Sequence, residues 1–454
     1  MKITLVSHAS LLIETNGMRL LTDPWYSGRI YHNAWELCPP PPALPDFRSL
    51  DAIFVSHAHP DHYHRPTLEQ IREERGGDIP VFVAEFFHDT IARDLRELGF
   101  RAVIEMTPGV EFRAFPRVSF FSQQFRMDDS LLVVVGHGDE TLVNINDAPL
   151  RGSTLIDLAK RFPRVDYCAA QFAIAQGYPY CYDNVQPDFT REDLVRRFDS
   201  FAQTLKPRHM IPFASFVRFC NGDNTHMNQH KMGLDELVKV STAKLTVLYP
   251  GDSIERGEVS SDEAHRARFE AAQRDESYVT ALDGVPLDDL DHKMRSFTRK
   301  LVERVPTLFR RKLPRFAFIL SDYPWGYLVA NDQVQRRPAA ELENESIQYR
   351  LASEVLAEAV DHDWGWADLS IGARFRARVL PGYENREIWF WVIPMLGGEG
   401  YLTLRTLWFI RPRALRIWWG RRLEVFDYLR NLLTGRFMTA VVRKKTSAIR
   451  PGRS

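Results

Sequence analysis

The sequence predicts an α/β protein of more than one domain, whose first domain has two sheets with helices on their outer faces. Short apolar runs come early and close together, which indicates several strands before the first helix. Helical and strand patterns then alternate, as expected of sheets that are covered by helices. The chain has 454 residues, more than one hydrophobic core usually organises. We therefore expect two domains.

The first third of the chain is predicted to be rich in strands. Its early apolar runs lie at residues 3–6, 11–13, 19–21 and 52–55. Helical patterns follow at 66–75 and 88–98, with a strand at 80–84 between them. Residues 112–145 are predicted to be consecutive strands, with turns at 128–129 and 136–139 where Asp and Gly gather.

The alternation continues to the expected end of the first domain. Helices are predicted at 151–161 and 190–205, and strands at 165–169 and 209–213. The apolar run 245–249 predicts a last strand, which ends at the turn Pro250-Gly251-Asp252. We therefore expect the first domain to span residues 1–255. Residues 256–295 are strongly charged and poor in large aliphatic side chains, and this pattern predicts a linker with an exposed helix.

Residues 296–404 are predicted to form a smaller α+β domain. Paired strands are expected at 315–320 and 325–329, an amphipathic helix at 347–360, and a strand with alternating apolar and basic residues at 371–379. This order of elements, with the phrase Trp364-Gly365-Trp366-Ala367-Asp368-Leu369, is similar to a sterol-carrier-protein-2-like domain. We expect this domain to cover the site of the first one and to shape its choice of substrate.

The C-terminal segment 405–454 is basic and aromatic. It holds thirteen Lys or Arg residues against Glu424 and Asp427, with Trp, Phe and Tyr residues among them. Such a segment suits a membrane surface, a nucleotide or an acidic carrier protein. It equally suits a helix whose aromatic rings pack on the protein while its arginines stay solvated. We expect peripheral contact with a membrane or with a carrier protein as the functional possibilities.

The overall composition excludes several classes of protein. Formal net charge is zero, so no global basic excess indicates a nucleic-acid binder. The chain starts with a strand pattern, and none of its apolar runs is long enough to span a bilayer. The cysteines are too irregularly spaced for a disulfide framework or a metal clip: Cys38, Cys168, Cys181 and Cys220. We therefore expect reduced thiols and a cytoplasmic protein.

The most informative feature is the run Ser56–His64, which follows the apolar strand 52–55. Alternate side chains of a strand share a face, so His57 and His59 are expected to project the same way. Pro60 turns the backbone, which lets Asp61 and His62 converge on a neighbouring point. Three imidazoles and one carboxylate within six residues predict a metal site for zinc, iron or manganese.

The run His57-Ala58-His59-Pro60-Asp61-His62 matches the HxHxDH signature of the metallo-β-lactamase fold. Residues 7–14, 21–25 and 142–147 also resemble the branch that contains the CMP-N-acetylneuraminate hydroxylases and the L-ascorbate-6-phosphate lactonases. The resemblance implies an αββα sandwich for the first domain. It also places Asp147 where the family has its metal-bridging aspartate, although an aspartate after a strand also serves as a turn or cap residue.

The chain departs from the hydrolytic members of this family at two ligand positions. No histidine lies in the strand 118–125, where Gln123, Gln124 or a water would have to replace it. The late histidine of lactonase-like members corresponds to Ala214, which cannot bind a metal. His209, five residues earlier, is a candidate substitute, with an ordinary strand histidine as the alternative.

The polar loop 213–230 is expected to face the site. His226 is the best candidate for a replacement ligand, with Asp223 and His230 behind it, and a solvated loop histidine is the alternative. Arg218 is a candidate for holding an anionic group of the substrate. Asp252 is expected to orient a ligand histidine. His8 and Asp23 are expected to have a structural role or to orient a ligand, and His64 is expected to be exposed.

These departures favour an iron-dependent oxygenase over a hydrolase. Retained carboxylates with fewer imidazoles suit iron, and the hydroxylase resemblance implies an iron site that is either dinuclear or mononuclear. The Rieske motifs CxH and CxxH are absent, so electrons would come from an external donor. The substrate would be small and anionic, or bound to a carrier protein. We expect Asp61, His226 and Arg218 to act in catalysis.

Two alternatives remain at this stage. One is a zinc- or manganese-dependent hydrolase of an ester, lactone or phosphodiester, in which Asp61 is a ligand or general base. The other is a metal-binding scaffold without catalytic activity, which would recognise a ligand through its C-terminal domain.

Overall fold

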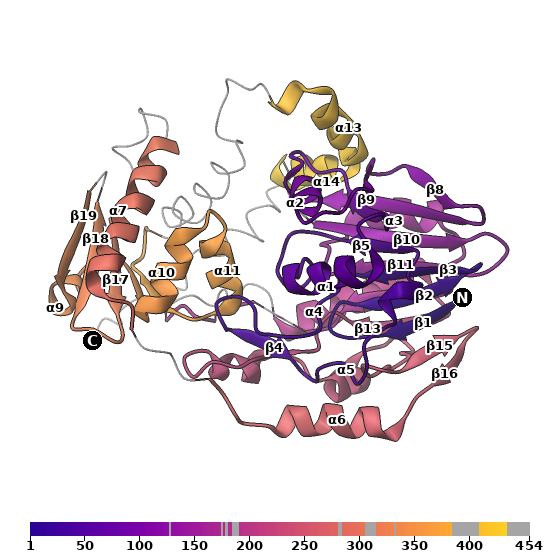
Figure 1. The fold of residues 1–454 in the computed structure, drawn as a ribbon, viewed down its shortest axis with the longest axis horizontal. Coiled ribbons are helices and arrows are strands. Elements are labelled where there is room, and N and C mark those ends of the chain that lie inside the picture. The colour runs from indigo at the N-terminus through magenta and orange to yellow at the C-terminus, as the bar shows by residue number, and fades with distance from the viewer. Residues whose placement is uncertain are drawn as a thin grey trace, which may run out of the picture.

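The protein forms two lobes of unequal size in a computed structural model (Figure 1). The structure describes residues 1–126, 129–173, 176–177, 180–183, 190–279, 284–304, 315–330, 333–383 and 408–433. The larger lobe contains the first 260 residues or so and also the last two described helices. The smaller lobe contains the described residues between 284 and 383.

The larger lobe is built on two facing sheets. The first has eight strands in the order β16-β15-β1-β2-β3-β5-β6-β7. They span Lys2–Leu5 (β1), Leu11–Thr15 (β2), Met18–Thr22 (β3), Ala52–Val55 (β5), Val81–Ala84 (β6), Val103–Met106 (β7), Ser253–Glu255 (β15) and Glu258–Ser260 (β16). The sheet therefore continues to residue 260, because β16 forms a hairpin with β15.

The second sheet has six strands in the order β13-β12-β11-β10-β9-β8. They span Glu111–Phe115 (β8), Val118–Phe125 (β9), Asp129–Gly136 (β10), Thr141–Asn146 (β11), Tyr167–Gln171 (β12) and His209–Phe213 (β13). Strands β11, β12 and β13 run parallel, so their carboxyl ends meet at one edge. Apolar side chains of both sheets interlock, as the rings of Phe82 and Phe120 show with centroids 5.0 Å apart.

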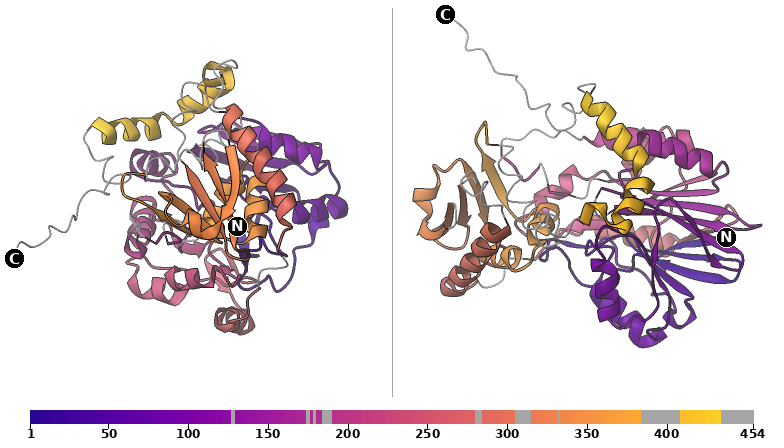
Figure 2. Two further views of the ribbon diagram at one scale, coloured as in Figure 1. Left: turned by 90° about the vertical axis from the view of Figure 1, so that its left-hand side faces the viewer. Right: turned by 90° about the horizontal axis from the view of Figure 1, so that it is seen from above.

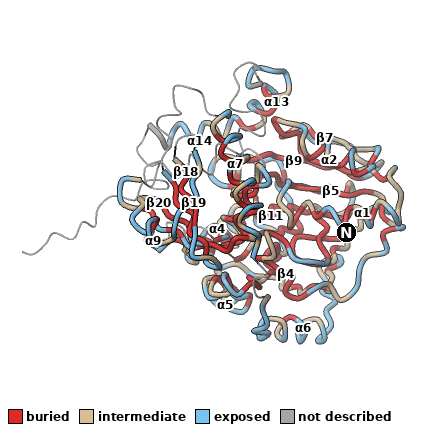
Figure 3. The backbone as a smooth tube through the Cα atoms, turned by 60° about the vertical axis from the view of Figure 1, so that its left-hand side comes forward, coloured by how far each residue is buried: buried red, intermediate tan, exposed pale blue. Residues whose placement is uncertain are grey.

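Helices cover the outer faces of both sheets. Helices α1 (Arg65–Arg75) and α2 (Thr90–Glu97) pack on the first sheet, and α3 (Gly152–Arg161) and α4 (Arg191–Leu205) on the second. The predicted αββα sandwich is thus confirmed, and Figure 3 shows its strands as the most buried part of the chain. The remaining helical elements here are Phe47–Ser49 (η1), Thr225–His230 (η2), Leu234–Val240 (α5) and Glu263–Arg274 (α6).

One predicted strand of this lobe is wrong. Residues 245–249 form no strand, and only Leu245 makes an isolated bridge, to Met210 on β13. The side chain of Asp252 accepts a hydrogen bond from the backbone N–H of Tyr249 at 2.9 Å, so a side-chain contact replaces the ladder there. The apolar pattern at residues 245–249 therefore reflects packing beside β13 and not the pairing of a further strand.

The smaller lobe is an α+β domain with five strands in the order β19-β18-β17-β20-β21. They span Phe316–Leu320 (β17), Trp325–Ala330 (β18), Gln333–Pro338 (β19), Ile347–Leu351 (β20) and Arg376–Val379 (β21). Its helices are Leu287–Arg304 (α7), Ala339–Leu342 (α9), Ser353–Asp361 (α10) and Gly365–Gly372 (α11). The likeness to sterol-carrier-protein-2-like domains stays a prediction.

Two expected elements of this lobe are divided differently. The predicted helix 347–360 is the strand β20 followed by α10, because Ile347, Tyr349 and Leu351 alternate at strand spacing and are all buried. The predicted strand 371–379 begins only at Arg376. Helix α11 runs to Gly372 before it, and Ala373 then takes a left-handed conformation with φ of 58°.

Two further helices, α13 (Pro412–Gly420) and α14 (Arg422–Leu433), follow the short helix η3 (Trp408–Ile410) and lie on the larger lobe (Figure 2). Asp427 of α14 accepts hydrogen bonds from Ser153 N and Ser153 Oγ, both at 2.7 Å, at the start of α3. The basic and aromatic segment therefore folds back on the first domain over its described part.

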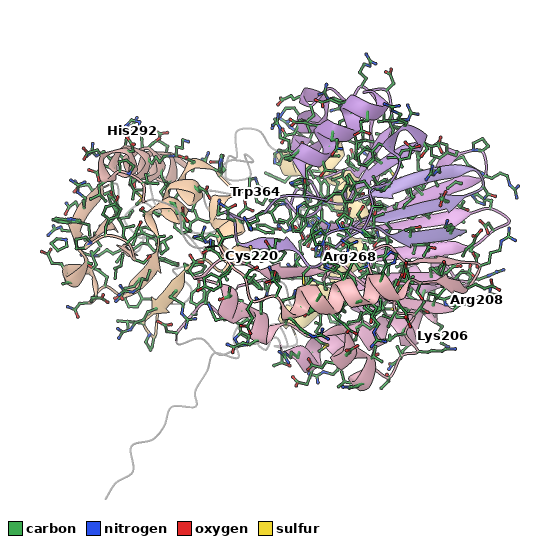
Figure 4. The ribbon with its side chains drawn as sticks, turned by 60° about the horizontal axis from the view of Figure 1, so that its bottom comes forward. Lys206, Arg208, Cys220, Arg268, His292 and Trp364 are labelled. Carbon is green, nitrogen blue, oxygen red and sulfur yellow. The ribbon has the colours of Figure 1, made fainter. Side chains whose placement is uncertain are left out.

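The two lobes share one hydrophobic core. Trp35 and Phe219, from the strands β4 (Trp35–Leu37) and β14 (Val217–Phe219), belong to the same cluster of buried side chains as Trp366 of α11. Figure 4 labels Cys220 and Trp364 where the lobes meet. The smaller lobe therefore packs directly against the segment of the larger lobe that leads to the site.

Candidate metal centre

The first group of possible metal ligands lies at the ends of β5 and β11. It consists of His57, His59 and Asp147, which each offer one atom within 4.8 Å of the others. His57 Nε2 lies 2.7 Å from His59 Nδ1 and 3.7 Å from Asp147 Oδ2. The expected convergence of His57 and His59 from the strand end therefore exists in the fold.

The second group lies beside the first and includes one unexpected residue. It consists of His8, Asp61 and His62, all of them buried. Asp61 Oδ2 lies 3.1 Å from His8 Nε2 and 3.1 Å from His62 Nε2. Asp147 Oδ2 is 3.7 Å from His62 Nε2 as well, so this carboxylate lies between the two groups.

The turn after β5 brings the second group into place. The backbone N–H groups of His62 and Tyr63 both donate to the carbonyl of His59, at 2.9 and 2.8 Å, which folds the chain back on itself. His64 then caps α1, since its Nδ1 faces Thr67 Oγ1 at 2.8 Å. His64 is therefore buried and structural, and its expected exposure is wrong.

Asp23 orients His62, in agreement with a supporting role. Asp23 Oδ2 lies 3.1 Å from His62 Nδ1 and accepts hydrogen bonds from Ser56 Oγ at 2.8 Å and Asn146 Nδ2 at 2.5 Å. Because Nδ1 is held in this way, Nε2 of His62 points to Asp61 and Asp147. A carboxylate that holds the far nitrogen of a ligand histidine is a common feature of metal sites.

The charges within the centre favour the metal-binding protonation states of His57 and Asp61, whereas Asp61 and Asp147 outweigh burial and raise the pKa of His62. Burial lowers the pKa of His57 well below its ordinary value, and the nearby His62 adds to this. Burial would raise the pKa of Asp61, but His62 and His8 hold it well below its usual range. A neutral imidazole and an ionised carboxylate are the forms that bind metals.

The donor atoms fit a pair of metal ions. Ligand atoms around one ion lie about 3 to 3.6 Å apart, close to the separations within each group. Two buried atoms, His8 Nδ1 and Asp147 Oδ1, have no hydrogen-bond partner among the described residues. His57, His59 and Asp147 would hold one ion, and His8, Asp61 and His62 the other, with Asp147 between them. The mixed nitrogen and oxygen set suits zinc, iron or manganese.

His8 stands beside the position where the family's late histidine is missing. The backbone N–H of Ala214 donates to the carbonyl of His8 at 2.9 Å. Ala214 itself has a positive φ of 51°, at the turn that follows β13. From the sequence, His8 was expected to have only a supporting role. The residues around it, Ser7-His8-Ala9, give no sign that the end of β1 and the end of β13 lie side by side.

Tyr31 was not expected at the site. Its hydroxyl donates to Asp61 Oδ1 at 2.5 Å, so both carboxylate oxygens of Asp61 are engaged. Three consecutive residues, Tyr31, His32 and Asn33, have positive φ values of 54°, 58° and 57°. Left-handed backbone costs roughly 1–2 kcal/mol for each residue with a side chain. Surrounding contacts must therefore hold this turn in place.

The smaller lobe supplies those contacts. His32 Nδ1 lies 2.7 Å from Glu358 Oε2 of α10, and the carbonyl of His32 accepts from Arg374 Nη1 at 2.6 Å. Asn224 Nδ2 donates to the carbonyls of Ala34, at 3.1 Å, and Gly372, at 2.7 Å. The turn that presents Tyr31 to Asp61 is therefore clamped between the lobes.

Asp368 on α11 brings a carboxylate of the smaller lobe near the centre. Burial raises its pKa, while the charges of His32 and His59 oppose that effect. Asp61 and Asp368 are in turn the two charges that most raise the pKa of Tyr31, after burial. No sequence motif marked Asp368 as a site residue, since only the packing of the lobes brings it here.

The structure places two predicted site residues outside both groups. His226 lies on η2, where its Nε2 is 3.4 Å from Arg376 Nη1 of the smaller lobe, and neither group includes it among the described residues. Arg218 on β14 pairs with Glu36 and with Asp275. Both ion pairs engage the guanidinium of Arg218, which was expected to bind a negatively charged group of the substrate.

The other candidates are engaged elsewhere. His209 Nδ1 lies 3.0 Å from Thr246 Oγ1, and its ring stacks on Tyr167. Asp252 Oδ1 lies 2.8 Å from His265 Nδ1. His265 is not a candidate metal ligand, so this contact does not orient a ligand histidine. Gln123 Nε2 donates to the carbonyls of Gln124 and Gly420, both at 3.2 Å. The remaining loop residues serve the lobe interface: Asp223 pairs with Arg374, and His230 stacks on Tyr180.

Comparison with known families agrees with this geometry. Residues 2–147 match the β-lactamase superfamily domain. The match covers about a third of the chain, and over these residues the chain is similar to the β-lactamase superfamily. The matched range contains β1 to β11 and ends at Asp147, and it therefore includes all six residues of the two ligand groups.

The relatives in sequence include hydroxylases. The chain is 37% identical over 86 residues to a cytidine monophosphate-N-acetylneuraminic acid hydroxylase of Asterias rubens, which is 18% of this chain and 13% of that protein. It is 33% identical over 195 residues to a putative Rieske 2Fe-2S iron-sulfur protein of Mycobacterium tuberculosis, 40% of this chain and 36% of that protein. The matches thus span about a third or less of these relatives. The resemblance to the hydroxylase branch is confirmed.

The solved structures that are similar to this chain include a hydrolase and a hydroxylase. An isothiocyanate hydrolase from Delia radicum gut bacteria matches with a TM-score of 0.41 and 15% identity, over 57% of this chain and 99% of that one. CmlA, a diiron β-hydroxylase from Streptomyces venezuelae, matches with a TM-score of 0.34 and 18% identity, over 62% of this chain and 52% of that one.

Within the described residues, none of the helices has the length and apolar character to span a membrane.

Proposed function

We propose that the protein is a metal-dependent hydroxylase with a dinuclear iron centre. The observation that carries this proposal is the position of Asp147, whose Oδ2 lies 3.7 Å from both His57 Nε2 and His62 Nε2, between two three-residue ligand groups. The sequence similarity to CMP-N-acetylneuraminic acid hydroxylases supports the same class of reaction. When bound, iron supplies the dioxygen activation that hydroxylation requires.

The remaining residues of the centre have separable tasks. Asp23 holds His62, and Tyr31 holds Asp61, so that the ligand atoms are set before any metal binds. Asp368 is our candidate for receiving or delivering a proton at the side of the smaller lobe, because burial keeps its pKa above that of an ordinary aspartate. The smaller lobe, which resembles sterol-carrier-protein-2-like domains in its sequence pattern, would exclude water and contact the substrate.

We propose a small anionic or carrier-bound substrate, and Arg197 replaces Arg218 as the residue expected to receive its negative group. Arg197 lies on α4, and its Nη2 donates to Gln171 Oε1 at 3.0 Å at the end of β12. Burial lowers the pKa of Arg197 to about 10, and Asp147 is the charge that most opposes this. Arg197 is therefore near the centre and still charged at neutral pH.

An external electron donor completes this proposal. All four cysteines are buried and none of them forms a disulfide bond, and the sequence has no CxH or CxxH pair for a Rieske cluster. The reducing equivalents would come from a separate reductase. Free thiols are typical of a reducing compartment, and we propose the cytoplasm.

The alternative is a zinc- or manganese-dependent hydrolase. The family signature His57–His62 with Asp147 favours it, because this set holds the metals of hydrolytic members of the superfamily as well. Asp61 is a poor general base here, since His8, His62 and Tyr31 engage both of its oxygens. A metal-binding scaffold without catalytic activity would be the remaining class of function.

Metal analysis of protein purified without air separates these possibilities. Near two irons per chain, with dioxygen uptake on addition of a chemical reductant, would support the hydroxylase. Two zinc or manganese ions without dioxygen uptake would contradict it and favour the hydrolase. Weak metal binding that is unchanged in His57→Ala and His59→Ala variants would indicate a scaffold.

A further inference from the structure

Helices α13 and α14 have one face that is fixed to the larger lobe. Arg413 pairs with Glu105 of β7, and Arg416 pairs with Glu85, just after β6. Ala414 and Ile417 are buried beside Phe87. Together with the contact of Asp427 and Ser153, these interactions determine which side of the two helices faces outward.

Both helices expose apolar side chains, which we call the apolar stripe. Leu415, Trp419, Phe426 and Leu429 are 54%, 71%, 57% and 49% exposed. Leu415 and Trp419 are four residues apart and lie on one side of α13. Arg422, Phe426 and Leu429 are spaced by four and three residues and lie on one side of α14. Eight of the seventeen large apolar residues that are exposed in the described chain lie between residues 409 and 429.

Such a stripe is unusual on a surface that faces only water. Contiguous exposed apolar side chains mark a surface that binds a partner or a membrane. Aromatic and leucine side chains on one face, with arginines on the other, are typical of helices that lie in the membrane interface.

The charges identify the partner as anionic. Arg422 lies over the ring of Trp419, with its guanidinium carbon 5.0 Å from the ring centroid, so the charge and the apolar surface are adjacent. The sequence that follows, residues 434–454, has six Lys or Arg and no acidic residue. Basic residues beside a membrane-binding helix attract anionic lipid headgroups.

We propose that α13 and α14 dock the protein on an anionic membrane surface. Leu415, Trp419 and Phe426 enter the boundary between headgroups and acyl chains. Arg422 contacts lipid phosphates. This site is separate from the metal centre, because none of the six residues of the two ligand groups lies on α13 or α14.

The test uses the full chain and vesicles of phosphatidylcholine, with or without phosphatidylserine. We expect the wild type to sediment with the phosphatidylserine vesicles and the double variant Trp419→Ser/Phe426→Ser to lose this binding by about tenfold or more. The matched control is Val238→Ser/Val240→Ser, which removes two apolar side chains that are 49% and 51% exposed on α5 and should bind like the wild type.

A second variant tests the charges. Arg422→Gln should weaken binding to phosphatidylserine vesicles, and added salt should weaken wild-type binding in the same way. Failure of the wild type to sediment, or equal sedimentation of Trp419→Ser/Phe426→Ser, would overturn the proposal. So would a dimer of the wild type that this double variant dissociates, because the stripe would then bind a second copy. Unchanged thermal unfolding of each variant confirms that it is folded.

Discussion

Asp147 is the side chain on which both ligand groups depend. Its Oδ2 faces His57 on one side and His62 on the other, and its Oδ1 has no hydrogen-bond partner among the described residues. The structure therefore gives Asp147 no evident task except to bind a cation. Its position at the end of β11 follows from the bulge at 144–146 and the positive φ of Asn146, which is 59°.

We predict that Asp147→Ala lowers metal content more than any change outside the two groups. Removing the shared carboxylate should cost at least one ion per chain, because both ions would lose a ligand. Elemental analysis after gel filtration measures this. Asp157→Ala, on the outer face of α3, is the matched control and should retain the wild-type content. Full metal content in Asp147→Ala would contradict the ligand assignment.

His8 and His226 give the sharpest comparison of two ligand assignments. His8 Nε2 lies 3.1 Å from Asp61 Oδ2, whereas His226 contacts Arg376 of the smaller lobe. We expect His8→Ala to lose about one ion per chain and His226→Ala to lose none. Titration with iron or zinc, followed by mass spectrometry of the intact protein, counts the ions. The opposite pattern would restore the sequence-based assignment of His226.

The left-handed turn 31–33 is the element that connects the lobes to the centre. Burial alone would lower the pKa of His32, but the hydrogen bond and charge of Glu358 outweigh it, and the pKa is raised above 6.5. Asp368, the carbonyl of Gly365 and Arg374 are the other polar groups packed around His32. The raised pKa of His32 therefore favours an ion pair between His32 and Glu358.

We predict that this clamp weakens as pH rises. A raised folded pKa means that His32 contributes stability fully below pH 6.5 and loses it as the pH passes the folded value. The pKa of Glu358 is lowered by the hydrogen bond from His32, so its own contribution is lost only as the pH falls through that lowered value.

Thermal unfolding between about pH 5.5 and about pH 9 measures the effect. The difference in midpoint between wild type and His32→Gln should shrink as the pH rises. His292→Gln, on the outer side of α7, is the control and should show no such trend. A pH-independent difference would contradict the clamp.

The two lobes of the molecule are joined by a buried charge network as well as by an apolar core. Arg374 is 2% exposed, and its guanidinium pairs with Asp223 at 3.1 Å and with Glu354 at 2.8 Å. Its third contact is the carbonyl of His32. The smaller lobe is thus held against the segment that presents Tyr31, which makes the site a property of both lobes.

We predict that Arg374→Ala destabilises the protein by about 1–3 kcal/mol, because Asp223 and Glu354 would lose their ion-pair partner and the carbonyl of His32 would lose its donor. Chemical denaturation with far-UV circular dichroism measures the loss. Arg378→Ala, exposed on β21, should change stability by less than about 0.5 kcal/mol. Similar midpoints for both variants would show that the network does not join the lobes.

We also predict that Asp368→Asn lowers turnover while metal content stays unchanged. The substitution keeps the size of the side chain and removes its proton-transfer capacity, for which a loss of about 100-fold is typical. Dioxygen uptake in the presence of reductant and metal analysis are measured on the same sample. Asp363→Asn, at the turn before α11, pairs with Arg304 and is the control. Loss of metal in Asp368→Asn would show a structural role instead.

Much of the larger lobe could be predicted from its residues. The helices at 66–75 and 190–205 and the strand at 209–213 agree with α1, α4 and β13 within one residue, because each carries a strong period of its own. The element 347–360 could not be divided correctly. Its first five residues fit either a helix or a strand locally, and only the pairing of β20 with β17 and β21 decides.

The sequence by itself predicted His57, His59, Asp61 and His62 as candidate ligands, because strand alternation and a proline turn position neighbouring residues without help from the rest of the chain. It indicated Asp147 only through the resemblance to the family. The tertiary structure decided that His8, Tyr31 and Asp368 join them and that His226 and Arg218 do not. These residues are up to 360 positions apart along the chain, from His8 to Asp368. No local pattern reports such a meeting, because it depends on how two sheets and a second lobe pack.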